Sequence, residues 1–420
     1  MPKRFSVIFL AAALLFTEAL SYPSETLSLD SLVKEAKEKN PEILAAKNRW
    51  DAALVRVPMA KSLDAPTVGV SFWKIPSTLN VFKAPNDEHM LTISQFLPLF
   101  GKLSLQGKIA LAESQIFAAE YRNKELEIVN NVRGAYYDLF MNYKEIELNE
   151  QNLSLLKSVA GISEAKYITG KTTQEDLFKI DLEIATLSNK IASLKLEQAA
   201  KKARVNSLLS RDPESPLGAP ELREDVVFNA DMTSLYKFTL ENQPELLTFS
   251  YAIERNKHAK ALAEKNRLPD LLAGITLRGI GTGSFGLWDL MLAFTVPFWF
   301  WSKQKYEVKE AISNLEEAKA AYEAMKNKSL LETKNLFTDI EISKNKIDLN
   351  KNNLIPMLES SINSSVANFS SGRGDLMALL DSERMLIETK MDYYRVLVKY
   401  NTDVADLEKA TGTEFTGVQK

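Results

Sequence analysis

The side chains that most often carry catalysis or bind metals are scarce in this chain. Histidine occurs only at His89 and His258, and cysteine does not occur. A transition-metal site needs clustered imidazole or thiolate ligands, so we expect no metal site. Without cysteine we expect neither disulfides nor a lipid anchor on an N-terminal cysteine. No nucleophile with a positioned base can be named, which indicates a protein that is not an enzyme and uses no cofactor.

Two short motifs match the sequence patterns of known binding sites. Residues 281–286 carry glycine at the first, third and last positions. This matches the dinucleotide fingerprint, but that chemistry needs a helix that opens at the glycines, and here a strand pattern follows. A loop between strands explains the glycines better. The adhesion tripeptide Arg373-Gly374-Asp375 lies between two helical patterns, which favours a turn of a helix hairpin.

The N-terminus has the pattern of an export signal. Lys3 and Arg4 precede an apolar run from Phe5 to Phe16, and small residues follow up to Ser21. The run is too short to span a bilayer, which takes about 20 residues. We therefore expect residues 1–21 to be a cleaved signal peptide, with a retained signal anchor as the alternative.

The overall charge and hydropathy restrict the possible partners. The formal net charge is −3, and removal of the signal peptide changes it to about −4. Such a weak charge leaves no electrostatic footprint for nucleic acid, so no nucleic-acid partner is expected. No later segment approaches 18 consecutive apolar residues, so we predict no transmembrane helix in the mature chain.

The chain repeats one plan twice. Asn-Pro-Glu at 40–42 is echoed by Gln-Pro-Glu at 243–245, and Gly170 and Gly372 keep a similar spacing of about 200 residues. Landmarks that keep order and spacing indicate a duplication. We assign the parts as follows: first repeat 22–210, turn-rich linker 211–231, second repeat 232–411 and C-terminal tail 412–420.

Long helices dominate each repeat. Rods are predicted from about 103 to 166 and from about 303 to 368, far longer than ordinary globular helices. Their apolar and small residues recur with a period near 3.5, as in a coiled coil. Pro356 is expected to kink or open the second rod. The remaining helices are predicted at about 28–61, from Gly170 to about 209, at 232–267 and at 375–411.

Apolar and polar residues alternate in the segments between the helices. Leu271, Ala273 and Ile275 alternate with Gly274 and Thr276, which places the two kinds on opposite faces of a sheet. Strands of about nine residues with one apolar face fit a membrane barrel, although a soluble sheet packed on a core has the same pattern. We predict strands at about 66–74, 89–97, 270–279 and 287–296.

The surroundings of these strands favour the membrane. The run Phe298-Trp299-Phe300-Trp301 follows the last strand and fits an aromatic girdle at a membrane interface. Four strands cannot close a barrel, and an open edge is not tolerated in lipid. Three chains would supply 12 strands, enough to leave an aqueous lumen.

These landmarks resemble the TolC-like outer membrane efflux protein family, whose subunits are duplicated helix–strand–strand–helix units. The matching features cover nearly all of the mature chain: Asn40-Pro41-Glu42, Leu97-Pro98-Leu99-Phe100-Gly101, Tyr167 with Gly170 and Asp176-Leu177, Pro297-Phe298, Leu354-Ile355-Pro356, and Gly372 with Leu379-Leu380-Asp381. The resemblance implies a mainly α fold with a small β part. As a homotrimer it would form an α-helical periplasmic barrel and a 12-stranded transmembrane β-barrel.

The resemblance also implies a role and partners. The protein would be a passive duct from periplasm to exterior, held by lipid in the outer membrane of a Gram-negative-type cell. It would dock to a periplasmic membrane-fusion adaptor and an inner-membrane pump. The alternative is an exported periplasmic coiled-coil adaptor or scaffold. The sequence does not indicate whether drugs, metal ions or proteins are carried.

Site residues follow from the same resemblance. The implied adaptor-docking residues at the periplasmic tip are Gly170, Lys171, Asp176, Gly372 and Arg373. Asp381 falls where some members carry one of two acidic residues that ring the closed aperture. The other position is Ala378 here, and Asp375 is a partial replacement. Three copies of Asp381 would favour cations, whereas the alternative is a solvated helix residue.

Overall fold

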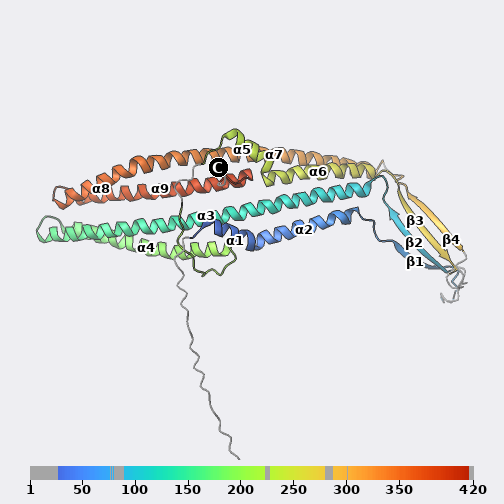
Figure 1. The fold of residues 1–420 in the computed structure, drawn as a ribbon, viewed down its shortest axis with the longest axis horizontal. Helices are drawn as coiled ribbons and strands as arrows, with labels where there is room; N and C mark the ends of the chain where they lie inside the picture. The colour runs from blue at the N-terminus through green and yellow to red at the C-terminus, as the bar shows by residue number, and fades with distance from the viewer. Residues whose placement is uncertain are drawn as a thin grey trace, which may run out of the picture.

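The computed structural model describes residues 27–75, 77, 79, 89–222, 228–279, 287–299 and 301–415. The predicted signal peptide, the glycine motif at 281–286 and Phe300 lie outside the described residues. The molecule is elongated: long helices run side by side over most of its length, and the strands lie together at one end (Figure 1).

Both repeats have the same order of elements. The first contains α1 (Leu29–Lys39), α2 (Pro41–Lys61), β1 (Thr67–Phe72), β2 (His89–Leu97), α3 (Lys102–Ile168) and α4 (Gln174–Leu208). The second contains α5 (Met232–Asn242), α6 (Pro244–Lys265), β3 (Asp270–Arg278), β4 (Leu287–Thr295), α7 (Lys303–Leu349), the π-helical turn η3 (Asn350–Leu354), α8 (Ile355–Ser370) and α9 (Leu376–Thr411).

The first predicted helix of each repeat, 28–61 and 232–267, is divided in two. Asn40 has an extended backbone, and its side chain accepts a hydrogen bond of 2.9 Å from an N–H of α2. Pro41 then takes the first helical position, where a missing N–H costs nothing. Pro244 starts α6 in the same way. The prediction of continuous helices was therefore wrong at these two positions.

Pro356 interrupts the second rod, as predicted. The rod passes from α7 through η3 into α8, and Pro356 lies in the first turn of α8. Proline cannot donate a hydrogen bond back along the helix and clashes with the preceding turn. A π-helical turn absorbs such a mismatch by adding a residue to the turn. The first rod, α3, has 67 residues without a break.

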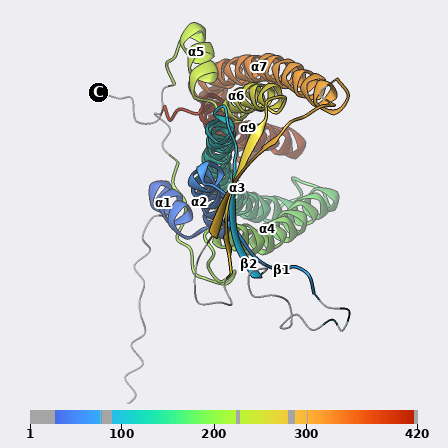
Figure 2. The ribbon, with the colours of Figure 1, turned by 90° about the vertical axis from the view of Figure 1, so that its right-hand side faces the viewer.

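The four strands form one antiparallel sheet in the order β1-β2-β3-β4. The central pair β2–β3 joins the two repeats, with Leu97 of β2 opposite Leu271 of β3. The outer strands of the single chain are β1 and β4. Viewed from the sheet end, the strands twist away from the helices (Figure 2). The predicted strands agree with this sheet, except that β1 is shorter than 66–74.

The core follows α3 along the molecule. This helix contacts α2 and α6 in the half near the sheet, and α4 and α9 in the other half. Its middle part packs Val132, Ala135 and Leu139 against Leu32 of α1. The mainly α-helical fold with a small antiparallel sheet, predicted from the sequence, is confirmed.

Candidate functional site

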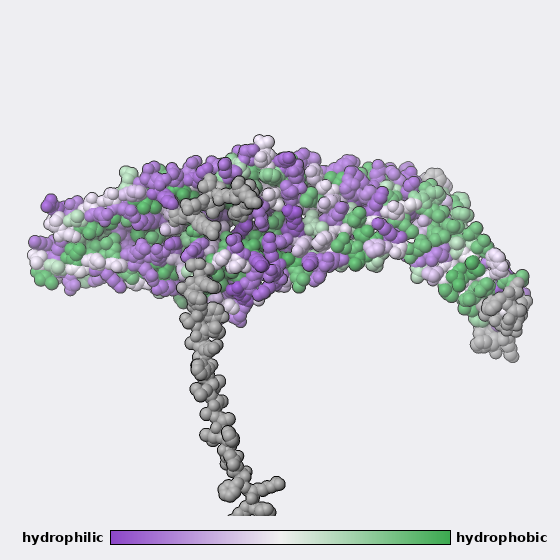
Figure 3. Space-filling model, in the orientation of Figure 1, coloured by the Kyte–Doolittle hydropathy of each residue, from purple (hydrophilic) through white to green (hydrophobic). Residues whose placement is uncertain are grey.

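The sheet exposes rows of apolar side chains on one face. Val68, Ile93, Ile275 and Leu290 stand opposite one another across the four strands. They are 62%, 46%, 48% and 58% exposed in the single chain. Figure 3 shows apolar residues gathered over this end of the molecule. An exposed apolar area of this kind marks a contact with lipid or with another protein chain.

The middle of the opposite face of the sheet is small and polar. Gly69, Thr92, Thr276 and Asp289 form the neighbouring row across the strands. The hydroxyl oxygens of Thr92 and Thr276 lie 2.9 Å apart and share a hydrogen bond. The alternation predicted from the sequence is therefore present in this row, whereas Phe96 and Leu272 pair in another row of the same face.

Aromatic residues follow β4 where the sheet joins the helices. Phe298, Trp299 and Trp301 are all exposed, and the two indole rings meet edge to face at 5.7 Å between centroids. Indole rings with this exposure suit a membrane–water interface. The girdle remains a prediction.

A buried ion pair fixes the sheet to the rods. Lys102, the first residue of α3, is 4% exposed, and its Nζ lies 2.7 Å from Oδ2 of Asp270. The same ammonium donates to the carbonyl oxygen of Leu268 at 2.9 Å. The other carboxylate oxygen of Asp270 accepts from the N–H of Leu99 at 3.0 Å. Sequence reasoning missed this pair, because its members lie in different repeats and no local pattern connects them.

The opposite end of the molecule, here called the tip, contains two helix hairpins. The hairpin of α3 and α4 turns at Gly170, and the hairpin of α8 and α9 turns at Gly372, side by side at the far left of Figure 1. Both glycines have positive φ angles, +69° and +77°, which side chains with a Cβ rarely adopt. The N–H groups of Lys171 and Arg373 close the turns with equivalent hydrogen bonds of 2.9 Å. Both glycine turns therefore lie at one end, as expected.

The two hairpins are tied to each other. Lys166 of α3 donates to the carbonyl oxygen of Phe369 at the end of α8, and its Nζ lies 3.7 Å from the centroid of the Phe369 ring. Arg384 of α9 forms an ion pair of 3.1 Å with Glu183 of α4. Beneath these contacts lies one apolar cluster: Leu156, Val159, Ile180, Leu187, Ile191, Ile362, Phe369, Leu376, Leu379, Leu380 and Leu386.

The predicted docking residues differ in their surroundings. Lys171 and Arg373 are exposed beside the turns. Asp176 instead caps α4: it accepts from the N–H of Thr173 at 3.2 Å and from the hydroxyl groups of Thr172 and Thr173 at 2.9 and 2.8 Å. Hydrogen bonds from Thr173 above all lower the pKa of Asp176. Its contacts within the chain are those of a capping box.

The predicted aperture residues both lie at the start of α9. Asp375 is the N-cap residue, is exposed, and makes no capping hydrogen bond with its side chain. The side chain of Asp381 is 66% exposed and lies 4.0 Å from Arg384. An acidic ring needs several subunits, so this assignment stays a prediction.

Glu383, a third acidic residue of α9, was not singled out from the sequence. It is 3% exposed, and a side-chain hydrogen bond links it to Asn152 of α3. Burial raises its pKa to about 7. The long helices contain many glutamates. The one feature of the sequence that could have singled out Glu383 is its position on the face of α9 opposite the exposed Asp381.

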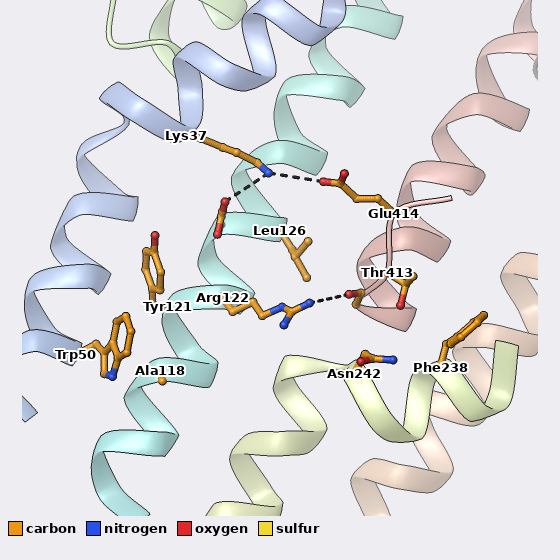
Figure 4. Close-up of a pocket in the computed structure, with 12 residues that line it drawn as sticks. Lys37, Trp50, Ala118, Tyr121, Arg122, Leu126, Phe238, Asn242, Thr413 and Glu414 are labelled. Atoms are coloured by element: carbon orange, nitrogen blue, oxygen red, sulfur yellow. Dashed lines mark hydrogen bonds and ion pairs between the residues drawn. The ribbon is translucent and has the colours of Figure 1, made fainter. Parts of the chain in front are cut away.

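An open cavity of about 680 Å³ lies midway along the molecule, between α2, α3, α5 and the end of α9. In Figure 4, Trp50 and Tyr121 lie at one side, stacked at 5.8 Å between ring centroids. Lys37 lies 3.4 Å from Glu125 and 3.6 Å from Glu414, and Arg122 donates to the Gly412 carbonyl. The basic groups of the cavity are thus engaged with neighbours.

The described residues offer neither a metal site nor a membrane-spanning helix. No group of three or more histidine, cysteine, aspartate or glutamate residues in that part of the chain is placed to hold a metal ion. None of the helices described is sufficiently long and apolar to cross a membrane.

The fold is that of outer-membrane channels. The solved structure of the outer-membrane channel OprN aligns with 99% of this chain and 99% of its own, with a TM-score of 0.78 and 17% identity. VceC from Vibrio cholerae covers 92% of this chain and 96% of its own, with a TM-score of 0.78 and 15% identity. The Campylobacter jejuni CmeC channel covers 96% and 92%, with a TM-score of 0.77 and 15% identity.

The sequence carries the corresponding family signature. Residues 32–211 match the sequence model of the outer membrane efflux protein family. A curated relative, the fusaric acid resistance protein FusA of Burkholderia cepacia, is 22% identical over 268 residues. The match covers 60% of this chain and about half the length of that relative. The resemblance stated from the sequence is confirmed.

Proposed function

We propose that this chain is the outer-membrane channel component of a tripartite efflux or export system, a passive duct from the periplasm to the exterior. The observation that carries this proposal is the sheet: it has exposed apolar rows on one face and a small polar row on the other, and it lies at the end of rods about 100 Å long. The family match and the shared fold support it. Such a duct needs no catalysis by the chain.

The sheet supports assembly as a homotrimer. Nearly all of β1 and β4, the outer strands, is exposed in the single chain. Unpaired strand edges are costly in lipid, because their N–H and C=O groups find no partner there. Pairing β4 of one subunit with β1 of the next would close a ring, and three subunits would supply 12 strands.

The helices also leave exposed side faces that could pair between subunits. In the tip half, α4 and α8 lie on the two sides of the subunit, where α4 packs mainly against α3 and α8 mainly against α9 (Figure 1). Leu182 and Leu196 of α4 and Met357 of α8 are largely exposed. The rotation that pairs the strands of neighbouring subunits would also bring these exposed side faces together and enclose a periplasmic tube. Its tip would dock to the periplasmic adaptor, with the inner-membrane pump behind it.

A soluble periplasmic coiled-coil adaptor or scaffold fits less well. In a soluble protein the apolar face of the sheet would pack on a core. Here no described helix covers the row from Val68 to Leu290, which stays about half exposed.

Membrane fractionation with one pair of variants tests the function. Leu290→Arg places a charge on the apolar row, which costs about 2–4 kcal/mol at the bilayer midplane. We expect several-fold less trimer in the outer-membrane fraction. The matched control Thr276→Arg lies next in register on the polar face and should assemble normally. A wild-type protein found only in the soluble periplasmic fraction, or equal loss in both variants, would contradict the proposal.

A further inference from the structure

A carboxyl group is buried among the helices of the tip. Glu383 of α9 is 3% exposed, although Asp381 and Arg384 on the same helix are exposed. The apolar cluster around it joins α3, α4, α8 and α9. Glutamate is rarely buried so completely without a cation, because the ionised group loses its hydration.

One carboxylate oxygen of Glu383 has no hydrogen-bond donor among the described residues, which disfavours the ionised form. Asn152 of α3, itself 9% exposed, shares a side-chain hydrogen bond with it. In the part of the chain that the structure describes, Oε1 of Glu383 and Oδ1 of Asn152 are buried without a hydrogen-bond partner. Both are acceptors, so an ionised Glu383 leaves both unsatisfied. A proton on Oε1 removes the cost of an ionised oxygen that no donor of the described chain reaches.

The charged groups around Glu383 act in opposite directions. Burial is the largest effect and raises the pKa of Glu383 to about 7, helped by the negative charge of Glu183 on α4. The hydrogen bond from Asn152 and the positive charge of Arg384 lower the pKa, but Arg384 is also paired with Glu183. On α8, Glu359 is engaged with Lys390 of α9 at 2.7 Å.

We propose that Glu383 is a pH-sensitive switch, which keeps the two hairpins of the tip packed while it is protonated and loosens them when it ionises. This inference rests on the proposed function, because it assigns a control element to the proposed periplasmic opening. Ionised Glu383 regains hydration only if α9 moves away from α3 and α4.

The direction of the pH dependence follows from the raised pKa. The folded tip holds the proton up to about pH 7, whereas an unfolded chain releases it near the ordinary value of 4.5. The stabilising contribution is therefore fully present below about pH 4.5 and is lost as the pH rises through about 7. Acid should close the tip, and alkali should loosen it.

Spin labels on the full mature protein test this directly. The chain has no cysteine, so cysteines introduced at the exposed positions Thr169 and Ser371 label one residue on each hairpin. The distance between the labels is measured in detergent from about pH 5 to about pH 8.5. We expect a narrow distribution in acid and a longer, broader one in alkali, with a midpoint near 7. A wild-type distribution that does not change over this range would overturn the proposal.

Three variants isolate the group responsible. Glu383→Gln removes the titration while keeping the shape, so the tip should stay packed at every pH. Glu388→Gln, on an exposed position of the same helix, should keep the wild-type response. Asn152→Ala removes a hydrogen bond that favours the ionised form, so the midpoint should move to higher pH. A response that persists in Glu383→Gln would overturn the proposal.

The design separates this inference from the proposed function. If Glu383→Gln does not fold, the pH midpoint of Asn152→Ala tests the switch instead. A midpoint equal to that of the wild type counts against the switch. The labels report on the tip without any transport. A pH-dependent tip in a protein that forms no membrane channel would contradict only the proposed function.

Discussion

Lys102 and Asp270 show how much of the architecture depends on single side chains. Their buried ion pair holds the start of α3 against β3, where rods and sheet meet. Removal of one partner leaves an uncompensated charge, which is more costly than replacing both partners by apolar residues. The pair therefore anchors the start of α3 to the start of β3.

We expect Lys102→Met to destabilise the protein by about 3 kcal/mol, because the carboxylate of Asp270 stays buried without its cation. Thermal unfolding of the protein in detergent, followed by circular dichroism, measures the change. The double variant Lys102→Met with Asp270→Leu should recover most of the loss. Equal melting temperatures for wild type and Lys102→Met would show that the ion pair has no such role.

The hairpins at the tip depend on their helix ends. Gly170 and Gly372 stop α3 and α8 with the left-handed conformation that glycine allows. Contacts between Lys166 and Phe369 and between Arg384 and Glu183 then bind one hairpin to the other. Because each pair joins different repeats, the tip responds as one unit to changes on either hairpin.

Lys171 and Arg373 are the exposed cations beside these turns. We expect Lys171→Glu or Arg373→Glu to weaken cross-linking to the periplasmic adaptor several-fold while trimers persist, because reversed charge disturbs electrostatic complementarity at the docking surface. Lys305→Glu, exposed near the sheet end of α7, is the control and should cross-link normally. Full cross-linking by both tip variants would refute the docking assignment.

The proposed trimer would have properties that a single chain lacks. Asp381 is solvent-exposed in one subunit, and three copies around an axis would concentrate negative potential in a narrow opening. Such a potential would favour bound cations. An aperture of this kind belongs to the trimer and not to the chain alone.

Asp381→Ala should raise the ion conductance of the protein in planar bilayers and reduce its preference for cations, since the variant removes the proposed ring of negative charge. Glu388→Gln, an exposed carboxyl change on the same helix, should leave both properties unaltered. Conductance and selectivity that match wild type in Asp381→Ala would exclude this residue from the aperture.

Local pattern alone determined the elements of this protein. Heptad-like spacing, alternating strands and the glycine landmarks report on residues close in sequence, so the rods, the four strands and both tip turns could be predicted. Pro356 was informative for the same reason: its effect on a helix is confined to the preceding turn. The divisions before Pro41 and Pro244 were equally local and could have been predicted from the prolines themselves.

Tertiary structure decided the contacts that join distant segments. Lys102 meets Asp270, and Asn152 meets Glu383, across the boundary between the repeats. On an isolated helix Glu383 resembles any other solvated glutamate, and only the packing of α3 and α4 against α9 removes it from water. Burial depends on which faces meet, and that is fixed by the whole fold rather than by the neighbours of a residue in the sequence.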